Sequence, residues 1–277
     1  LNGFGKTTGM VQVEELGVIE SPIMLTNTFA VPTITHGTLT YMLAQNKEIG
    51  DTTGTINIVV GECNDSKLNS IRTLPVTPEH AIQAIEGATE QQATEGAVGA
   101  GTGMTCFGYK GGIGSASRII VQENGQYTVG CLVLSNFGTK EEFQWDKYHL
   151  QGNNNNSERP NDGSIIIVLA TDAPLSSRQL KRIIKRCGIG LGRTGSHFSH
   201  GSGDIVIGFT TACKIPHFSE TLLETRQQLR DEHPVMNELF TATAEATEEA
   251  ILNSLSQAVT TTGRNGTTVQ AFPWIQE

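Results

Sequence analysis

The stretch Ser164-Ile-Ile-Ile-Val-Leu-Ala-Thr171 decides the fold. An almost continuous apolar run of this length is typical of a strand that is buried on both faces, at the centre of a sheet. The segment 151–163, directly before it, is the most polar and least periodic part of the chain and predicts an exposed loop. The sequence therefore predicts an interior strand that the chain enters straight from a polar loop.

Further strands and helices are predicted on both sides of this strand. Asn124-Gly125 between two β-rich runs indicates a hairpin, and Thr77 followed by Pro78 indicates the start of a helix. The other predicted strands are 56–60, 117–121, 127–135 and 204–212, and the other predicted helices are 177–187 and 235–258. Strands and helices alternate without a linker or an internal repeat, so we expect a single α/β domain over residues 1–277.

Composition limits the classes of function. The net charge of −9 argues against nucleic-acid binding, and the basic run 181–186 is interrupted at helical spacing, which is typical of a solvated helix face. No apolar stretch is long enough for a membrane span. Five cysteines without a C-x-x-C pair predict buried thiols in a reducing compartment, so we expect a cytoplasmic protein. The chain begins at Leu1 without Met, and we expect a further segment upstream.

Several short motifs carry little chemical information. Gly5-Lys6-Thr7-Thr8 resembles the end of a phosphate-binding loop, but the first glycine of that motif and its preceding strand are missing. The glycines of 99–103 and 110–114 are typical of tight turns. His197 and His200 lie in a loop without the third ligand that a catalytic zinc ion usually has. The sequence predicts no cofactor and no metal ion.

The junction between Gly163 and Ser164 is chemically more informative. A glycine that ends a loop and a serine that begins a strand need no function. Cleavage of the bond between them, however, would leave Ser164 with a free α-amine beside its own hydroxyl. The unperturbed pKa of an α-amine is about 7.7–8.0, so this amine can take the hydroxyl proton near neutral pH. This is the N-terminal-amine form of nucleophile activation.

The residues around this junction carry a family likeness. Asp162-Gly-Ser-Ile-Ile-Ile-Val-Leu-Ala-Thr-Asp-Ala-Pro-Leu175, followed by Gly201-Ser-Gly-Asp-Ile205, resembles the DmpA family of L-aminopeptidase/D-esterase/amidases, which includes the β-peptidyl aminopeptidases. The similarity extends along the whole chain in the order of the family's motifs, through segments 25–28, 98–103, 110–114, 248–251 and 262–264. The resemblance implies an αββα sandwich, self-cleavage into chains 1–163 and 164–277, and a homo-oligomer, namely a tetramer of processed protomers.

The resemblance also implies roles for individual residues. Ser164 matches the nucleophile that self-cleavage releases, and Ser202 and Asp204 match the serine and the acid that complete the family's arrangement. β-Peptidyl aminopeptidases carry Glu as this acid, so the side chain of Asp204 is one methylene shorter. Asn136 matches the amide of the oxyanion hole, and Glu62 matches the carboxylate that binds the free amine of the substrate.

Asn64, just after Glu62, stands where some members carry an aromatic side chain, which leaves the acyl-side specificity open. The activity implied is the hydrolysis of small peptides or amides with a free N-terminal amine. Two alternatives remain at this point. One is an acetyltransferase of the ornithine acetyltransferase type, although that family is expected to use threonine where this chain has Ser164. The other is a non-catalytic relative that keeps the fold and binds small amines or peptides.

Overall fold

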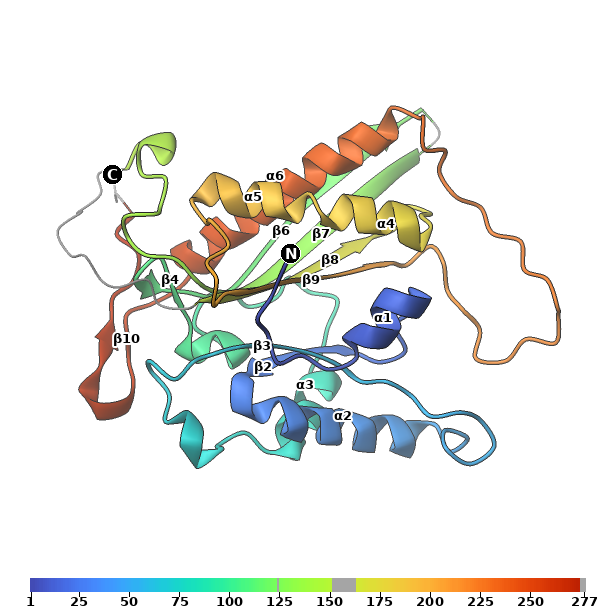
Figure 1. Ribbon diagram of the computed structural model, residues 1–277, viewed down its shortest axis with the longest axis horizontal. Coiled ribbons are helices and arrows are strands. Elements are labelled where there is room, and N and C mark those ends of the chain that lie inside the picture. The colour runs from blue at the N-terminus through green and yellow to red at the C-terminus, as the bar shows by residue number, and fades with distance from the viewer. Residues whose placement is uncertain (124, 151–162, 275–277) are drawn as a thin grey trace.

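The computed structural model describes residues 1–123, 125–150 and 163–274. Figure 1 shows helices α4–α6 on one face of the main sheet, and the pair β2–β3 with helices α2 and α3 on its other face. Three buried apolar clusters lie between successive layers: one between α4–α6 and the main sheet, one between the two sheets, and one between the second sheet and helices α2 and α3. The arrangement is therefore the expected αββα sandwich. The predicted loop at 151–163 falls outside the described residues except for Gly163, and the predicted turn residue Asn124 also lies outside them.

The main sheet has five strands in the order β1-β9-β8-β7-β6. Their bounds are β1 Asn2–Gly3, β6 Gly112–Gln122, β7 Gly125–Asn136, β8 Ser164–Thr171 and β9 Gly203–Thr210. β6, β7 and β8 are antiparallel, whereas β8 and β9 run parallel and β1 pairs antiparallel with β9. The predicted hairpin strands are confirmed, and both continue further than the sequence pattern indicated.

Strand β8 is the central strand, as its apolar run predicts. Ile165, Ile167 and Leu169 pack into the cluster beneath helices α4–α6, while Ile166 packs into the cluster between the two sheets. Because successive side chains of a strand point to opposite faces, covering both faces requires apolar residues at odd and even positions alike. The beginning of β8 is thereby fixed from both sides.

The second sheet pairs β2 (Ile23–Asn27) in parallel with β3 (Val59–Cys63). The strand predicted at 56–60 is present, but its predicted bounds were wrong, since β3 begins at Val59 and passes through Gly61. A Cβ at Gly61 would lie 2.9 Å from the side chain of Ile166 in the main sheet. The glycine therefore lets the two sheets approach closely, and β3 continues so that Glu62 lies within it.

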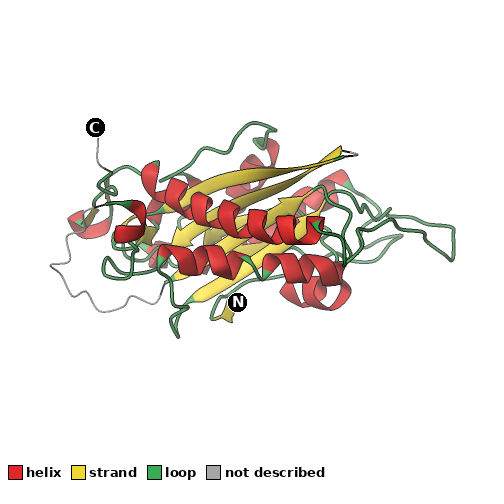
Figure 2. Cartoon of the chain, turned by 90° about the horizontal axis from the view of Figure 1, so that it is seen from above, coloured by secondary structure: helices red, strands yellow, loops and turns green. Residues whose placement is uncertain are grey.

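Helices α2–α6 cover the two outer faces, as the view in Figure 2 also shows for the larger group, whereas α1 packs Met10 and Val13 against the cluster between the two sheets. The bounds of the helices are α1 Met10–Leu16, α2 Val31–Gln45, α3 Pro78–Glu86, α4 Ser177–Ile184, α5 Cys187–Thr194 and α6 Val235–Ser256. The starts of α3 and α6 are as predicted. The helix predicted at 177–187 ends earlier, at Ile184, and a further helix begins at Cys187. Between them the amide of Arg186 bonds to the carbonyl of Ile183 at 2.8 Å, which tightens the chain into a turn.

The basic run lies on an exposed helix face, as predicted, where Lys181 pairs with Glu14 at 2.8 Å and Arg182 pairs with Asp231 at 3.4 Å. All five cysteines are free thiols; four are buried, and Cys213 is only partly buried, which differs from the prediction. None of the helices in the described ranges is long and apolar enough to cross a membrane.

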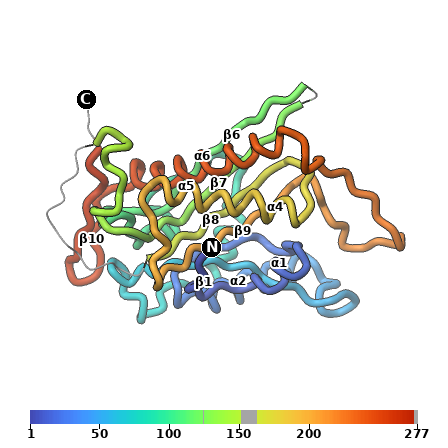
Figure 3. Tube along the Cα trace, turned by 45° about the horizontal axis from the view of Figure 1, so that its top comes forward, coloured from blue at the N-terminus to red at the C-terminus, as the bar shows by residue number. Residues whose placement is uncertain are grey.

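Short elements complete the part of the fold near the ends of β7 and β8. β4 (Thr105–Cys106) and β5 (Tyr109–Lys110) form a two-stranded hairpin, and β10 (Thr261–Thr262) pairs with β11 (Thr268–Val269). The N-terminal segment runs beside β9 and then joins the second sheet through mutual backbone bonds between Thr8 and Val60. Figure 3 shows this segment next to β9.

Candidate active site

The predicted nucleophile lies in a row of three residues across the main sheet. Ser164 is the register partner of Asn136 on β7 and of Gly203 on β9. Ser164 is partly exposed at the start of β8, whereas the next three residues are buried. Strand pairing therefore brings together three positions that lie far apart in the sequence.

The backbone amide of Gly203 contacts both sides of the Gly163–Ser164 bond. Its nitrogen lies 3.2 Å from Ser164 Oγ and 3.3 Å from the carbonyl oxygen of Gly163. A Cβ at Gly203 would lie 3.2 Å from Ser164 Oγ and 3.0 Å from the nitrogen of Gly5. A larger residue here would therefore crowd the serine hydroxyl and the Gly5 backbone.

Ser202 and Asp204 form a hydrogen-bonded pair at the start of β9. The hydroxyl of Ser202 donates to Asp204 Oδ1 at 2.8 Å, and both residues are buried. The side chains of residues two apart lie on the same side of a strand, which suits this contact. Burial raises the pKa of Asp204, and the bond from Ser202 acts in the opposite direction. The other carboxylate oxygen, Oδ2, is buried without a hydrogen-bond partner among the described residues.

The side-chain amide of Asn136 is held at both ends. Its Oδ1 accepts from the backbone amide of Thr105 at 2.9 Å, and its Nδ2 donates to the carbonyl of Asn64 at 3.0 Å. A primary amide nitrogen carries two protons, so the contact with Asn64 uses one of them. The orientation of Asn136, the register partner of Ser164, is thus fixed while a second proton remains on its Nδ2.

Glu62 lies in the second sheet and is almost completely buried, with 3% of its surface exposed. Its Oε1 accepts from the backbone amide of Lys6 at 2.8 Å, and its Oε2 accepts from the hydroxyl of Thr28. Gly5 connects this carboxylate to the main sheet, because Gly5 lies beside Gly203 as well as beside Glu62. The structure thereby links Glu62 to the row that contains Ser164.

Asn64 contributes to the site through its backbone. Its carbonyl holds Asn136, whereas its exposed side chain accepts from the amide of Ser66 at 3.0 Å. Its place on the acyl side of the substrate stays a prediction.

Sequence reasoning missed three parts of this site. The first is the segment of Gly5 and Lys6, which was considered only as a remnant of a phosphate loop. The others are Thr28 and Thr105, whose hydroxyl and amide hold Glu62 and Asn136. The quoted family motif at 25–28 includes Thr28 and was the only available signal for it.

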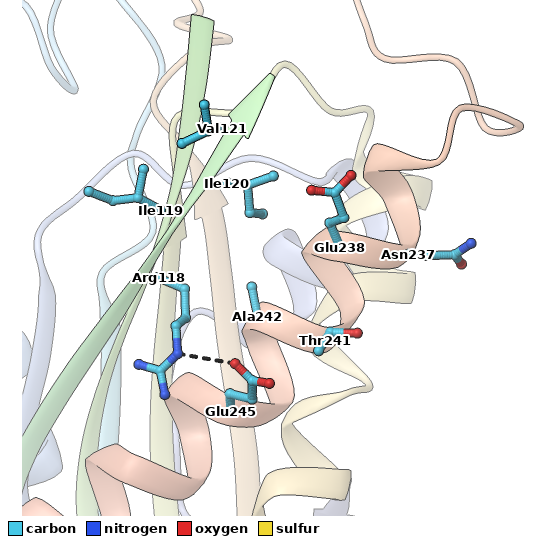
Figure 4. A pocket seen from close by; sticks show the side chains of 9 residues that line it. All are labelled: Arg118, Ile119, Ile120, Val121, Asn237, Glu238, Thr241, Ala242 and Glu245. Atoms are coloured by element: carbon cyan, nitrogen blue, oxygen red, sulfur yellow. Dashed lines mark hydrogen bonds and ion pairs between the residues drawn. The ribbon is translucent and has the colours of Figure 1, made fainter. Parts of the chain in front are cut away.

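A pocket lies elsewhere on the molecule, between the distal half of β6 and the first turns of α6 (Figure 4). Arg118 on β6 forms an ion pair with Glu245 on α6 at 3.2 Å at the edge of this pocket. None of the predicted site residues lines this pocket. The row at the ends of β7, β8 and β9 is therefore a separate location.

Comparisons with known proteins assign the family. The model of peptidase family S58 matches residues 1–269. A β-peptidyl aminopeptidase, BapA, of Sphingosinicella microcystinivorans is 40% identical over 98% of this chain and 72% of its own length. The BapA of Sphingosinicella xenopeptidilytica is 33% identical over 99% of this chain and 71% of its own length.

Solved structures agree with this assignment. The PH0078 protein of Pyrococcus horikoshii OT3 superposes with a TM-score of 0.88 at 47% identity, over 99% of this chain and 75% of that one. An L-aminopeptidase D-Ala-esterase/amidase of Ochrobactrum anthropi, described as a prototype of the serine aminopeptidases and a variant of the Ntn-hydrolase fold, has a TM-score of 0.89 at 32% identity, over 99% and 76% of the two chains. The chain therefore belongs to peptidase family S58 and is an aminopeptidase of the N-terminal-nucleophile (Ntn) hydrolase type.

Proposed function

We propose that the chain cleaves itself between Gly163 and Ser164, and that the released Ser164 hydrolyses small peptides or amides that carry a free N-terminal amine. The observation that carries this proposal is the row of Asn136, Ser164 and Gly203 across three paired strands. It gathers a hydroxyl, a side-chain amide and a backbone amide at the point where the predicted cut falls. The peptidase family match supports the same assignment.

Self-cleavage would begin with attack of Ser164 Oγ on the carbonyl carbon of Gly163. The bond between that carbon and the nitrogen of Ser164 breaks, an ester to Oγ forms, and the nitrogen takes up a proton to become the α-amine. The Gly203 amide, 3.3 Å from the Gly163 oxygen, suits the negative charge that develops there. Water then hydrolyses the ester, which leaves a carboxylate on Gly163 and a free hydroxyl on Ser164.

Substrate hydrolysis would use the same hydroxyl with the new amine as its base. The amine takes the proton of Oγ while Oγ attacks the substrate carbonyl, and it then passes the proton to the leaving amine. The free proton on Asn136 Nδ2 would stabilise the oxyanion, a contribution of about 2.7–4 kcal/mol in comparable sites. Water resolves the acyl-enzyme and regenerates the serine.

The pair of Ser202 and Asp204 would orient the α-amine. Because the proton of Ser202 is donated to Asp204, the oxygen of Ser202 offers lone pairs to other donors. It would therefore accept from the amine of Ser164. The shorter Asp, in place of the family's Glu, already reaches Ser202 at 2.8 Å, so the loss of one methylene does not break this contact.

Glu62 would bind the ammonium group of the substrate. A carboxylate holds an ammonium through charge-assisted hydrogen bonds, and requiring that contact restricts cleavage to the first residue of a peptide. The two contacts from Lys6 and Thr28 fix the orientation of the carboxylate. Each carboxylate oxygen can accept more than one hydrogen bond, so these contacts leave room for a substrate.

We also propose that the processed protomers assemble into a homotetramer. In support, the segment between β9 and α6, which extends away from the molecule in Figure 1, exposes four large apolar side chains. These are Ile215, Phe218, Leu222 and Leu223. Light scattering on the purified protein tests the assembly, and a monomeric mass for the fully active protein would refute it.

The catalytic proposal is tested by supplying matched substrates. Aminoacyl-p-nitroanilides with a free amine should release p-nitroaniline, and their N-acetylated counterparts should not. Acetyl transfer from an acetylated donor to glutamate should be absent, which separates this activity from that of an ornithine acetyltransferase. Release of p-nitroaniline from both substrate types at equal rates would contradict the aminopeptidase assignment.

A further inference from the structure

Lys110 is a fully buried cation that the reaction described above does not use. The residue ends β5, and none of its surface is exposed. Its ammonium group donates to three backbone carbonyls, those of Gly101 at 2.8 Å, Met104 at 2.8 Å and Gly111 at 2.7 Å. Within the described ranges no carboxylate forms an ion pair with it. Burial lowers the pKa of Lys110 to about 8.

A buried ammonium without a carboxylate partner costs more free energy than a neutral hydrogen-bond donor would at the same place. Removing a charge from water costs several kcal/mol in a protein interior, whereas neutral donors can satisfy backbone carbonyls. The ammonium differs from such donors because its hydrogen bonds are charge-assisted and roughly twice as strong as neutral ones. We therefore expect a functional role for at least one of the three charge-assisted hydrogen bonds.

The carbonyl of Met104 leads directly to the active site. Met104 supplies the oxygen and Thr105 the nitrogen of one peptide unit, and the Thr105 amide donates to Asn136 Oδ1 at 2.9 Å. The hydrogen bond from Lys110 to the oxygen of this unit polarises its N–H group, because hydrogen bonds in a chain strengthen one another. The amide of Asn136 is the next unit in the same chain. Withdrawal of electron density at its Oδ1 makes the protons on its Nδ2 better donors.

We propose that Lys110 is a positioning residue for the reaction, which orients and polarises Asn136 through the peptide unit between Met104 and Thr105. This inference rests on the proposed role of Asn136 as the oxyanion donor. The chain of contacts runs from the ammonium through two amide groups to the Nδ2 group of Asn136, the register partner of Ser164. The effect of Lys110 on catalysis then depends entirely on Asn136, although Lys110 itself touches no substrate.

The test is a double-mutant cycle on kcat, normalised to the amount of processed protein measured on a denaturing gel. Lys110→Met should lower kcat about tenfold or more and leave KM within about twofold, since oxyanion stabilisation belongs to the transition state. Asn136→Ala alone should lower kcat by roughly 100–1,000-fold. In the Asn136→Ala background, Lys110→Met should have no further effect on kcat.

Two more variants separate positioning from general damage. Lys110→Gln keeps N–H donors without the charge, so its kcat should lie between those of the wild type and Lys110→Met, and it replaces Lys110→Met in the cycle if that variant does not fold. The matched control is Lys140→Met. The ammonium of Lys140 lies 4.7 Å from the ring centre of Tyr109 on the same hairpin. Among the hydrogen bonds of the described residues, the side-chain donor to the Met104 carbonyl is Lys110. The kcat of Lys140→Met should stay within about twofold of the wild type.

The outcomes are distinct. Independent, multiplying effects of Lys110→Met and Asn136→Ala, or an unchanged kcat in Lys110→Met, would overturn the inference and leave the proposed function standing. A loss of kcat in Lys140→Met equal to that in Lys110→Met would also overturn it, because the effect would then belong to the hairpin as a whole. An unchanged kcat in Asn136→Ala alone would remove the oxyanion role, and the inference would fail with it.

Discussion

The backbone nitrogen of Gly203 lies 3.2 Å from the hydroxyl oxygen of Ser164, across the parallel pairing of β8 and β9. The same nitrogen lies 3.3 Å from the carbonyl oxygen of Gly163. One donor therefore contacts both the nucleophile and the carbonyl of the bond that we propose is cut. Because a strand ladder fixes this donor, it needs no rearrangement before self-cleavage.

Replacement of Gly203 tests whether this geometry matters. A Cβ at this position would lie 3.2 Å from Ser164 Oγ and 3.0 Å from the nitrogen of Gly5, so Gly203→Ala must displace one of them. We expect self-cleavage and kcat to fall about tenfold or more, since small displacements of reacting groups have large kinetic costs. Gly192→Ala is the matched control, because a Cβ there meets nothing within 4 Å. Equal behaviour of the two variants would contradict the proposed role of Gly203.

The raised pKa of Asp204 predicts a pH dependence of stability. Its pKa in the folded protein lies above the ordinary value of 3.8 because of burial, so the folded state binds this proton more tightly than the unfolded state does. The contribution of Asp204 to the free energy of unfolding therefore falls as pH rises from 3.8 through the folded pKa. At neutral pH the buried, ionised carboxylate destabilises the folded state.

Asp204→Asn should remove this pH dependence and raise the thermal unfolding midpoint at pH 7, while it lowers kcat because Ser202 loses its anionic acceptor. The acid side of the kcat/KM profile also contains the titration of the Ser164 α-amine, so the effect of Asp204 on activity is read from the kcat of the variant at pH 7. Unfolding scans across acidic pH and rate measurements at pH 7 test the two effects. A variant that is less stable than the wild type at pH 7, or fully active, would refute the assignment.

The role of Glu62 predicts a change in selectivity. Glu62→Gln removes the charge that would hold the substrate ammonium, and hydrogen bonds to charged groups contribute about 1.5–3 kcal/mol. We expect KM for aminoacyl-p-nitroanilides to rise roughly 10–100-fold, with a smaller effect on substrates that lack the amine. Glu15→Gln, at an exposed position of α1, should change neither value. Proportional loss on both substrate types would remove Glu62 from the amine site.

The sequence predicted the central strand well because a strand that is buried on both faces needs a continuous run of apolar residues. The same logic failed for β3, where residues 56–58 are as apolar as those that form the strand, and where Gly61 falls inside the strand. The break between α4 and α5 also escaped prediction, because apolar spacing continues across it. Local patterns report which residues are buried, and they report the ends of elements less well.

Apart from the junction between Gly163 and Ser164, the site could not be derived from local patterns. Asn136, Ser164 and Gly203 come together through strand register, a relationship between segments that are distant in the sequence. The family resemblance supplied Asn136 and Glu62, which taken alone would be a turn residue and a strand-end carboxylate. The glycines of 110–114 predict a tight turn, so the sequence did not indicate that Lys110 is buried. Its sequence signals are the mostly apolar residues 104–109 before it and its place in the family motif at 110–114.

The mass of the active protein tests the central claim most directly. Catalytically competent protein, separated under denaturing conditions, should give a fragment whose mass matches residues 164–277 and whose first residue on N-terminal sequencing is Ser164. Ser164→Ala should give a single uncut chain without activity. Fully active protein in which Gly163 and Ser164 are still joined would contradict the account.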